Sequence, residues 1–255
     1  MLGARQAKLK SKLVILAALV LIAVVSCTAL YAVWQLKFSV SVTEDRETLF
    51  QISPFNTFAQ GNYDGNITYG ELAEHGDFGI GTLNGLNGEM IALNGVFYQI
   101  PVEGTPRQID SSEKTPYATA TFFEADQTSQ VADALNYSEL TTYIDGILPS
   151  ENAIYAIKVS GVYDYVKTRS VPMQAKPYQP LTEAIKNQTV FTLNNVAATA
   201  VGFWFPSSMD GVDFTGYHLH LITDDHGAGG HLLDCIVRNA TVEIDQTRRF
   251  TMVLP

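Results

Sequence analysis

The stretch GTLNGLNGEMIALNGVFYQIPVEG, residues 81–104, contains Asn-Gly pairs at positions 84–85, 87–88 and 94–95. Short runs in which apolar and polar residues alternate lie between these pairs. Asn-Gly favours the tight turns of β-hairpins, and alternation with a period of two is typical of strands. The stretch therefore predicts an antiparallel meander of short strands.

Segments beyond this meander extend the β-rich pattern. The sequence predicts a strand over residues 118–125 and a short helix over 138–148 that begins at a Ser cap. It also predicts a long or bent strand pair over 152–171, with Gly161 at the turn, and a helical stretch over 176–188. Strands return from residue 190 onward. This pattern indicates a β-rich α+β fold with a division near residue 150.

Composition places the chain among globular proteins and disfavours a nucleic-acid binder. Of its 255 residues, 46% are hydrophobic and 11% are aromatic, as in chains that bury a core. The formal net charge is −10, and four of the 16 basic residues lie in the first twelve positions, whereas all 26 acidic residues lie beyond them. Binding to phosphate backbones needs clustered Lys and Arg. We therefore expect no nucleic-acid partner.

An apolar segment near the N-terminus indicates export. Residues 13–34, LVILAALVLIAVVSCTALYAVW, carry no charge and are numerous enough for a helix that spans a bilayer. Basic residues precede the segment and acidic ones follow it, so the positive-inside rule places the bulk of the chain outside the cytoplasm. We expect an uncleaved membrane anchor, with a cleaved signal peptide or lipidation at Cys27 as alternatives. Cys27 and Cys235 are interpreted as free thiols.

Four of the five histidines lie in GYHLHLITDDHGAGGH, residues 216–231. In a strand, His218 and His220 project from the same side, about 7 Å apart, so both rings can reach one metal ion. The glycines that follow permit a tight turn, which can bring His231 opposite the pair. Three neutral nitrogen ligands without a compulsory fourth protein ligand are typical of catalytic zinc. The pattern therefore predicts a zinc site at His218, His220 and His231.

The other residues of this segment have different expected roles. Asp224 and Asp225 are expected to accept hydrogen bonds from the ring N–H groups of the ligands. His226 is interpreted as a solvated residue at the tip of the turn and is excluded as a ligand. Half-buried strand histidines with ordinary hydrogen bonds are the competing interpretation, and they would be favoured for a His-x-His pair alone.

Two charged residues have strand positions that suit either catalysis or solvation. Glu89 begins the run EMIAL on its apolar face, so its carboxylate is solvated at the strand end, paired, or held at a raised pKa. Arg169 shares a strand face with Tyr163, Tyr165 and Lys167, for which a solvated face is the simpler interpretation. Residue patterns alone thus indicate an exported β-rich protein with a three-histidine metal site.

Three longer segments carry a family resemblance: residues 63–95, 148–181 and 216–234. They contain HGDFGIGT, then KTR followed by KPY, then GYHLH followed by GGH, in this order. Together they resemble the alpha-acetolactate decarboxylase family, and the resemblance extends over about residues 50–255. It implies a zinc enzyme that converts (S)-2-acetolactate to (R)-acetoin and CO2.

The resemblance also implies roles for named residues. It assigns the metal to the same three histidines as the strand pattern does. Glu89 matches a catalytic position, Arg169 a position that serves catalysis and substrate binding, and Thr82 a substrate-binding position in the same cleft. The chemistry agrees, because the hydroxyl and carbonyl oxygens of acetolactate can chelate one cation, which acts as a Lewis acid.

The family fold implies a domain order for this chain. An N-terminal mixed β-sheet domain is expected over residues 49–150 and a C-terminal β-barrel-like domain over residues 151–255. Residues 1–36 form the basic N-terminus with the transmembrane or signal helix, and residues 37–48 form a linker. A homodimer is expected, located outside the cytoplasm, either anchored to the membrane or secreted after cleavage.

Two rival hypotheses remain at this level. Family chains generally continue past the position of Pro255 and carry there a glutamate that reaches the metal cleft. A membrane-tethered metal- or ligand-binding protein with impaired catalysis is therefore the alternative, and bound zinc without turnover would favour it. Another three-histidine barrel enzyme, such as a cupin-like oxygenase or hydrolase, would be indicated by iron dependence.

Overall fold

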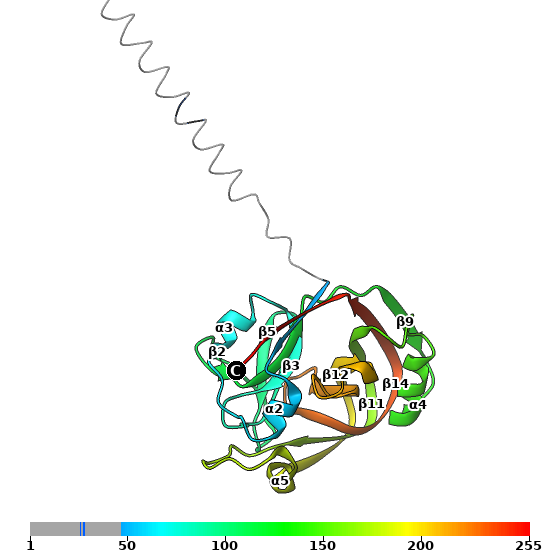
Figure 1. Cartoon of the computed structure of the whole chain (residues 1–255). Helices are drawn as coiled ribbons and strands as arrows, with labels where there is room; N and C mark the ends of the chain where they lie inside the picture. The colour runs from blue at the N-terminus through cyan, green and yellow to red at the C-terminus, as the bar shows by residue number, and fades with distance from the viewer. Residues whose placement is uncertain (1–25, 27, 29–46) are drawn as a thin grey trace, which may run out of the picture. The chain divides into compact units, whose positions relative to one another are not determined.

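A seven-stranded and a six-stranded sheet carry most of the chain in the computed structural model, which describes Ser26, Thr28 and residues 47–255 (Figure 1). Apart from Ser26 and Thr28, the expected transmembrane or signal helix lies outside these residues, as does most of the linker. No helix among the described residues is long and apolar enough to cross a membrane. Residues 45–255 cluster as one compact unit.

The seven-stranded sheet contains the predicted meander. Its order is β15 (Arg249–Val253), β1 (Thr48–Ile52), β8 (Tyr117–Thr121), β3 (Phe78–Thr82), β4 (Glu89–Leu93), β5 (Val96–Ile100) and β6 (Arg107–Gln108). The β1–β15 pair is parallel and the other pairs are antiparallel, so the sheet is mixed. Asn94 and Gly95 form the β4–β5 turn, both with positive φ, as a type I′ hairpin requires. The other two Asn-Gly pairs lie in the longer β3–β4 loop.

The six-stranded sheet curves into a barrel-like ring. Its long strands are β11 (Ile154–Ser170), β12 (Thr189–Phe205), β13 (Gly216–Thr223) and β14 (Gly229–Thr247). In the sheet β14 pairs with β11, β11 with β12 and β12 with β13, and β13 also pairs with β14, which closes the ring. The short strands β9 (Gln127–Val131) and β10 (Leu135–Asn136) add to β14.

The two sheets share a hydrophobic core, and each sheet includes strands from both halves of the described chain. Ile80 and Ile91 of the first sheet belong to the same buried cluster as Val201, Phe203 and Ile222 of the second. Strands β9 and β10 precede residue 150 but pair with the second sheet, and β15 follows it but pairs with the first. Strands thus cross the expected boundary in both directions, and the two-domain division stays a prediction.

Two predicted elements differ from the structure. Residues 154–170 form one continuous strand, so the strand pair with a turn at Gly161 is wrong. The register between β11 and β14 shifts there, and a Cβ on Gly161 would lie 3.1 Å from the Cα of Ala240. Glycine therefore permits close approach of two strands and does not form a turn.

The predicted helix at 138–148 is α4 (Tyr137–Asp145), which begins one residue earlier than expected. Asn136 is its N-cap, in place of the expected Ser. The Asn136 side chain accepts a hydrogen bond from the Glu139 N–H (3.0 Å), and the Glu139 carboxylate accepts one from the Asn136 N–H (2.8 Å). This capping box satisfies two backbone donors that a helix start otherwise leaves free.

Short elements complete the described chain. They are the helices α2 (Phe55–Ala59), α3 (Tyr69–Leu72) and α5 (Leu181–Ala184), the 3-10 turns Ile185–Asn187 and Ser207–Met209, and the strand pair β2 (Ile67–Thr68) with β7 (Lys114–Thr115). The helical spacing predicted after the prolines of residues 176–188 is thus confirmed over residues 181–187, as α5 with its 3-10 turn. Helices α2 and α5 both contribute side chains to the cavity described next.

Candidate active site

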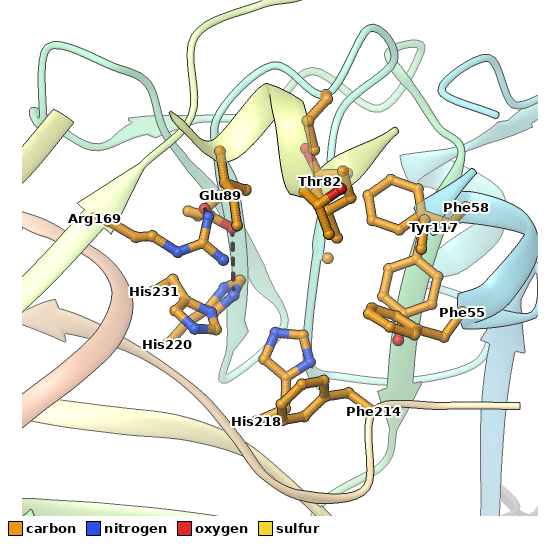
Figure 2. A pocket seen from close by; sticks show the side chains of 16 residues that line it. Phe55, Phe58, Thr82, Glu89, Tyr117, Arg169, Phe214, His218, His220 and His231 are labelled. Atoms are coloured by element: carbon orange, nitrogen blue, oxygen red, sulfur yellow. Dashed lines mark hydrogen bonds and ion pairs between the residues drawn. The ribbon is translucent and has the colours of Figure 1, made fainter. Parts of the chain in front are cut away.

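The three predicted ligand histidines converge in space. His218 and His220 project from the same face of β13, and His220 pairs in register with His231 at the start of β14. Their ring centroids are 5.1 to 5.3 Å apart, and one nitrogen of each ring lies within 4.8 Å of the others. Figure 2 shows the three rings gathered beneath Glu89 and Arg169. The structure thus brings together the three histidines that the sequence pattern predicted to be ligands.

The free nitrogens of these rings are what a metal ion would bind. His218 Nδ1, His220 Nε2 and His231 Nδ1 are buried and have no hydrogen-bond partner among the described residues. The other nitrogen of His220, Nδ1, lies 2.8 Å from the Met90 carbonyl oxygen. A carbonyl only accepts, so this bond places the proton on Nδ1 and leaves the Nε2 lone pair free.

The expected support from the turn aspartates is wrong. Asp224 and Asp225 are exposed, and the Asp225 carboxylate accepts hydrogen bonds from the Thr223 hydroxyl and the Gly227 N–H. A backbone carbonyl of β4 supports His220 instead. His226 lies at the exposed turn with a positive φ, and its ring packs beside Tyr98.

Burial keeps the three imidazoles neutral. It lowers the pKa of His218 to about 3, with the Arg169 cation adding to the effect. Burial and neighbouring charges also lower the pKa values of His220 and His231 well below the ordinary value. Neutral rings with unpartnered, convergent nitrogens fit a metal that accepts imidazole ligands, and zinc is one such metal.

Glu89 and Arg169 meet directly above the histidines. Glu89 begins β4 and Arg169 lies near the end of β11, and Arg169 Nη1 is 3.3 Å from Glu89 Oε1. Glu89 Oε2 also lies 3.4 Å from His220 Nε2. Desolvation raises the pKa of Glu89, whereas the charge of Arg169 opposes that shift. Of the interpretations left open for Glu89, the paired carboxylate is the one that the structure shows, and Arg169 does not lie on a solvated face.

These groups form one end of a cavity of about 370 Å³. Thr82 lies in its wall, and the Thr82 hydroxyl donates to the Gly88 carbonyl oxygen (2.6 Å). The remaining wall is largely apolar, and its aromatic members extend from the side opposite Glu89 and Arg169 to a ring that lies beside His218 (Figure 2). They include Phe55, Phe58, Tyr117 and Phe214. The sequence analysis missed this aromatic wall.

The fold and the site together define a class of protein, one with a barrel-like sheet that carries a three-histidine cluster able to hold a metal ion at one end of a largely apolar cavity. A family model described as Alpha-acetolactate decarboxylase matches residues 49–255. The Alpha-acetolactate decarboxylase of Methanosarcina mazei is 46% identical over 209 residues, which are 82% of this chain and 73% of the relative. The chain therefore belongs to the alpha-acetolactate decarboxylase family.

Other relatives agree. The Alpha-acetolactate decarboxylase of Methylococcus capsulatus is 44% identical over 214 residues, which cover 83% of this chain and 81% of the relative. The crystal structure of acetolactate decarboxylase from Bacillus subtilis subspecies spizizenii has a TM-score of 0.80 at 38% identity, covering 82% of this chain and 90% of that one. The family resemblance is thus confirmed, and the binding-protein alternative is not favoured.

Proposed function

We propose that this chain decarboxylates (S)-2-acetolactate to (R)-acetoin and CO2, with zinc held by His218, His220 and His231. The observation that carries the proposal is the gathering of three histidine rings, each with a buried nitrogen that makes no hydrogen bond within the described chain, beside the Glu89–Arg169 pair. Zinc, when bound, would supply a Lewis acid for the neighbouring hydroxyl and carbonyl oxygens of the substrate.

The residues around the histidines bind different parts of the substrate. The Arg169 guanidinium offers fixed donors for the substrate carboxylate, and planar guanidinium suits bidentate binding of such a group. The apolar wall receives the two methyl groups of the substrate and excludes water. Substrate held in this way loses CO2 from the end that Arg169 contacts.

Protonation of carbon completes the reaction. When the bond to CO2 breaks, its electron pair remains on the former carboxyl-bearing carbon and is delocalised onto the adjacent carbonyl oxygen as an enediolate. A proton added to that carbon gives acetoin. Among the described residues that line the cavity, Glu89 has the only carboxyl group, and the Thr82 hydroxyl is engaged with a carbonyl. We assign proton delivery to Glu89, or to water that it holds, because a guanidinium group is a poor proton donor.

The experiment is an assay of acetoin formed from racemic 2-acetolactate by the zinc-loaded protein, with the product resolved by chiral gas chromatography. We expect consumption of one enantiomer and a single product enantiomer, because one fixed donor protonates one face. Zinc-loaded protein that makes no acetoin would contradict the proposal and favour the binding-protein alternative. Iron-dependent oxygenation or hydrolysis of another substrate, without acetoin formation, would favour the oxygenase or hydrolase alternative.

We also propose that the protein is a homodimer outside the cytoplasm, anchored by residues 13–34 or secreted after their removal. The charge pattern around that segment supports the location, and the family resemblance supports the dimer. Size-exclusion chromatography with light scattering tests the dimer. Fractionation of cells that express the full chain tests the location.

A further inference from the structure

A buried carboxylate lies behind the aromatic wall and takes no part in the reaction described above. Asp213 belongs to the connection between β12 and β13, and only 1% of its surface is exposed. Asp213 Oδ1 accepts hydrogen bonds from the Tyr117 hydroxyl (2.7 Å) and from the Phe214 N–H (2.6 Å), and Oδ2 accepts one from the Thr119 hydroxyl (3.2 Å). A carboxylate held by three donors is fixed in position.

Two of these donors belong to residues that line the cavity, Tyr117 and Phe214. The Tyr117 ring stacks on Phe58, with centroids 4.8 Å apart, and its edge meets Phe55. Because the Tyr117 hydroxyl is bound to Asp213, the residue presents only its ring to the substrate. The bond to Asp213 therefore makes this part of the wall apolar.

Phe214 is held less by packing than the other rings of the wall, because 46% of its surface is exposed. The hydrogen bond to Asp213 is therefore important for its position. Its ring lies edge-on to Phe55 and to His218, with centroids 5.8 Å apart in both cases. It thus stands at the boundary between the aromatic wall and the histidine cluster. Its backbone N–H bond to Asp213 ties that position to β8, where Tyr117 and Thr119 lie.

The connection has other anchors that do not depend on Asp213. The Val212 carbonyl oxygen accepts hydrogen bonds from the Phe55 N–H (2.8 Å) and from the Gln51 side chain (2.7 Å). The Gly211 carbonyl oxygen accepts one from the Asn56 N–H (3.2 Å). Loss of the Asp213 carboxylate therefore frees the wall residues while the preceding backbone remains attached to β1 and α2.

We propose that Asp213 is a positioning residue that fixes the aromatic wall against which the alkyl part of the substrate binds. It acts through Tyr117 and Phe214 and contacts neither the substrate nor the metal ligands. This inference rests on the proposed function, since the wall meets the methyl groups of 2-acetolactate. Its effect belongs to substrate binding, so it changes KM far more than kcat or zinc content.

The test compares Asp213→Ala, Asp213→Asn and the control Asp210→Ala, which removes an exposed carboxylate from the same connection. We expect Asp213→Ala to raise KM about tenfold, because small displacements of positioning groups are costly. Its kcat and zinc content should stay within about twofold of the wild-type values. A raised KM with kcat retained indicates that substrate binding is weakened and the chemical step is not. Asn keeps an acceptor oxygen for Tyr117 and Phe214, so Asp213→Asn should restore KM, and Asp210→Ala should match the wild type.

A second readout is independent of turnover. Amide hydrogen exchange of residues 209–215, followed by mass spectrometry, should be faster in Asp213→Ala than in the wild type and restored in Asp213→Asn. If the wild type makes no acetoin, the proposed function fails, and the exchange data alone decide the role of Asp213. Unchanged KM and exchange in a folded Asp213→Ala protein would overturn the inference, as would a fall in kcat or zinc content with KM unchanged.

Tyr117→Phe covers the case in which Asp213→Ala does not fold. This variant keeps the ring and removes only the hydroxyl that Asp213 holds. A raised KM with kcat retained supports the positioning role. A wild-type KM together with wild-type exchange of residues 209–215 overturns it.

Discussion

At the residue scale, three ring nitrogens without hydrogen-bond partners in the described chain determine what the site can bind. A buried polar atom without a hydrogen-bond partner destabilises a fold by about 1–3 kcal/mol. Three such atoms, one on each of His218, His220 and His231, lie together in this cavity. A bound cation would satisfy all three at once, so the same feature that destabilises the metal-free protein favours metal binding.

The role of Glu89 gives the first prediction. Glu89→Gln keeps the size of the side chain and its hydrogen-bonding capacity but removes the transferable proton. We expect turnover to fall by about 10²-fold or more, as is typical for loss of a general acid. Zinc content, measured by mass spectrometry, should not change, because Glu89 is not among the proposed zinc ligands. Full turnover with unchanged product chirality would exclude Glu89 as the proton donor.

The stability of the protein should depend on the ionisation of Asp213. Burial raises the pKa of Asp213 from 3.8 to about 6. A carboxyl group whose pKa is raised on folding stabilises the fold while it is protonated, below pH 4, and loses that contribution as the pH rises through 6. The loss is on the order of 3 kcal/mol.

Urea denaturation at pH 4 to 7 measures this dependence. The free energy of unfolding of the wild type should fall across this interval relative to that of Asp213→Asn, which does not ionise. Asp210→Asn, a substitution at an exposed site, should follow the wild type. Parallel curves for the wild type and Asp213→Asn would show that Asp213 titrates normally.

Much of the site, but not its surroundings, could be predicted from the sequence. His218, His220 and His231 follow from local spacing and one glycine turn. The acceptor for His220 is the Met90 carbonyl, which lies 130 residues away in the chain and depends on how the two sheets pack. The aromatic wall combines α2, β8 and the β12–β13 connection, and alternation does not tell which buried rings face a cavity.

At the scale of elements, β12 and β13 hold the metal-binding face in place. Gly202 on β12 pairs with Leu219 on β13, and a Cβ at Gly202 would lie 2.0 Å from the His218 carbonyl oxygen. Alanine there must push the two strands apart. Overpacking of this kind costs about 1–3 kcal/mol.

Gly202→Ala is therefore expected to lower Tm and to weaken zinc binding, because His218 and His220 move with β13. Gly146→Ala is the matched control, since its Cβ would meet nothing closer than 3.4 Å at the end of α4. Differential scanning calorimetry and zinc titration measure both effects. Equal Tm and zinc affinity in the two variants would mean that β12–β13 spacing does not position the ligands.

Element boundaries show where sequence patterns stop being informative. The Asn94-Gly95 hairpin was predicted because both turn residues favour positive φ. The continuous strand through Gly161 was not, because a glycine that permits close strand approach looks the same in a sequence as one that forms a turn. That distinction depends on Ala240 of β14, a long-range neighbour.

At the scale of the whole molecule, the first and last strands of the described chain are neighbours in one sheet. β15 pairs in parallel with β1, and the Ser53 N–H donates to the Val253 carbonyl oxygen (2.8 Å). Removal of residues 249–255 leaves the β1 edge unpaired, so we expect Tm to fall by several degrees. Removal of residues 254–255 alone should have little effect, because Leu254 is 69% exposed and lies beyond β15.

None of residues 249–255 lines the cavity. The shortened protein should therefore keep its kcat at a temperature where it remains folded. Circular dichroism on heating gives Tm, and the acetoin assay gives kcat. An unchanged Tm after removal of residues 249–255 would contradict the stabilising role of β15.

Zinc bound by His218, His220 and His231 is proposed to be required for the decarboxylation of 2-acetolactate. The most direct measurement is acetoin formation as zinc is added stepwise to metal-free protein, with His218→Ala as the control. The account predicts that activity rises in proportion to zinc, reaches a plateau at one equivalent per chain, and is absent in His218→Ala. A plateau of bound zinc without acetoin, or substantial acetoin formation by metal-free protein or by His218→Ala, would contradict it.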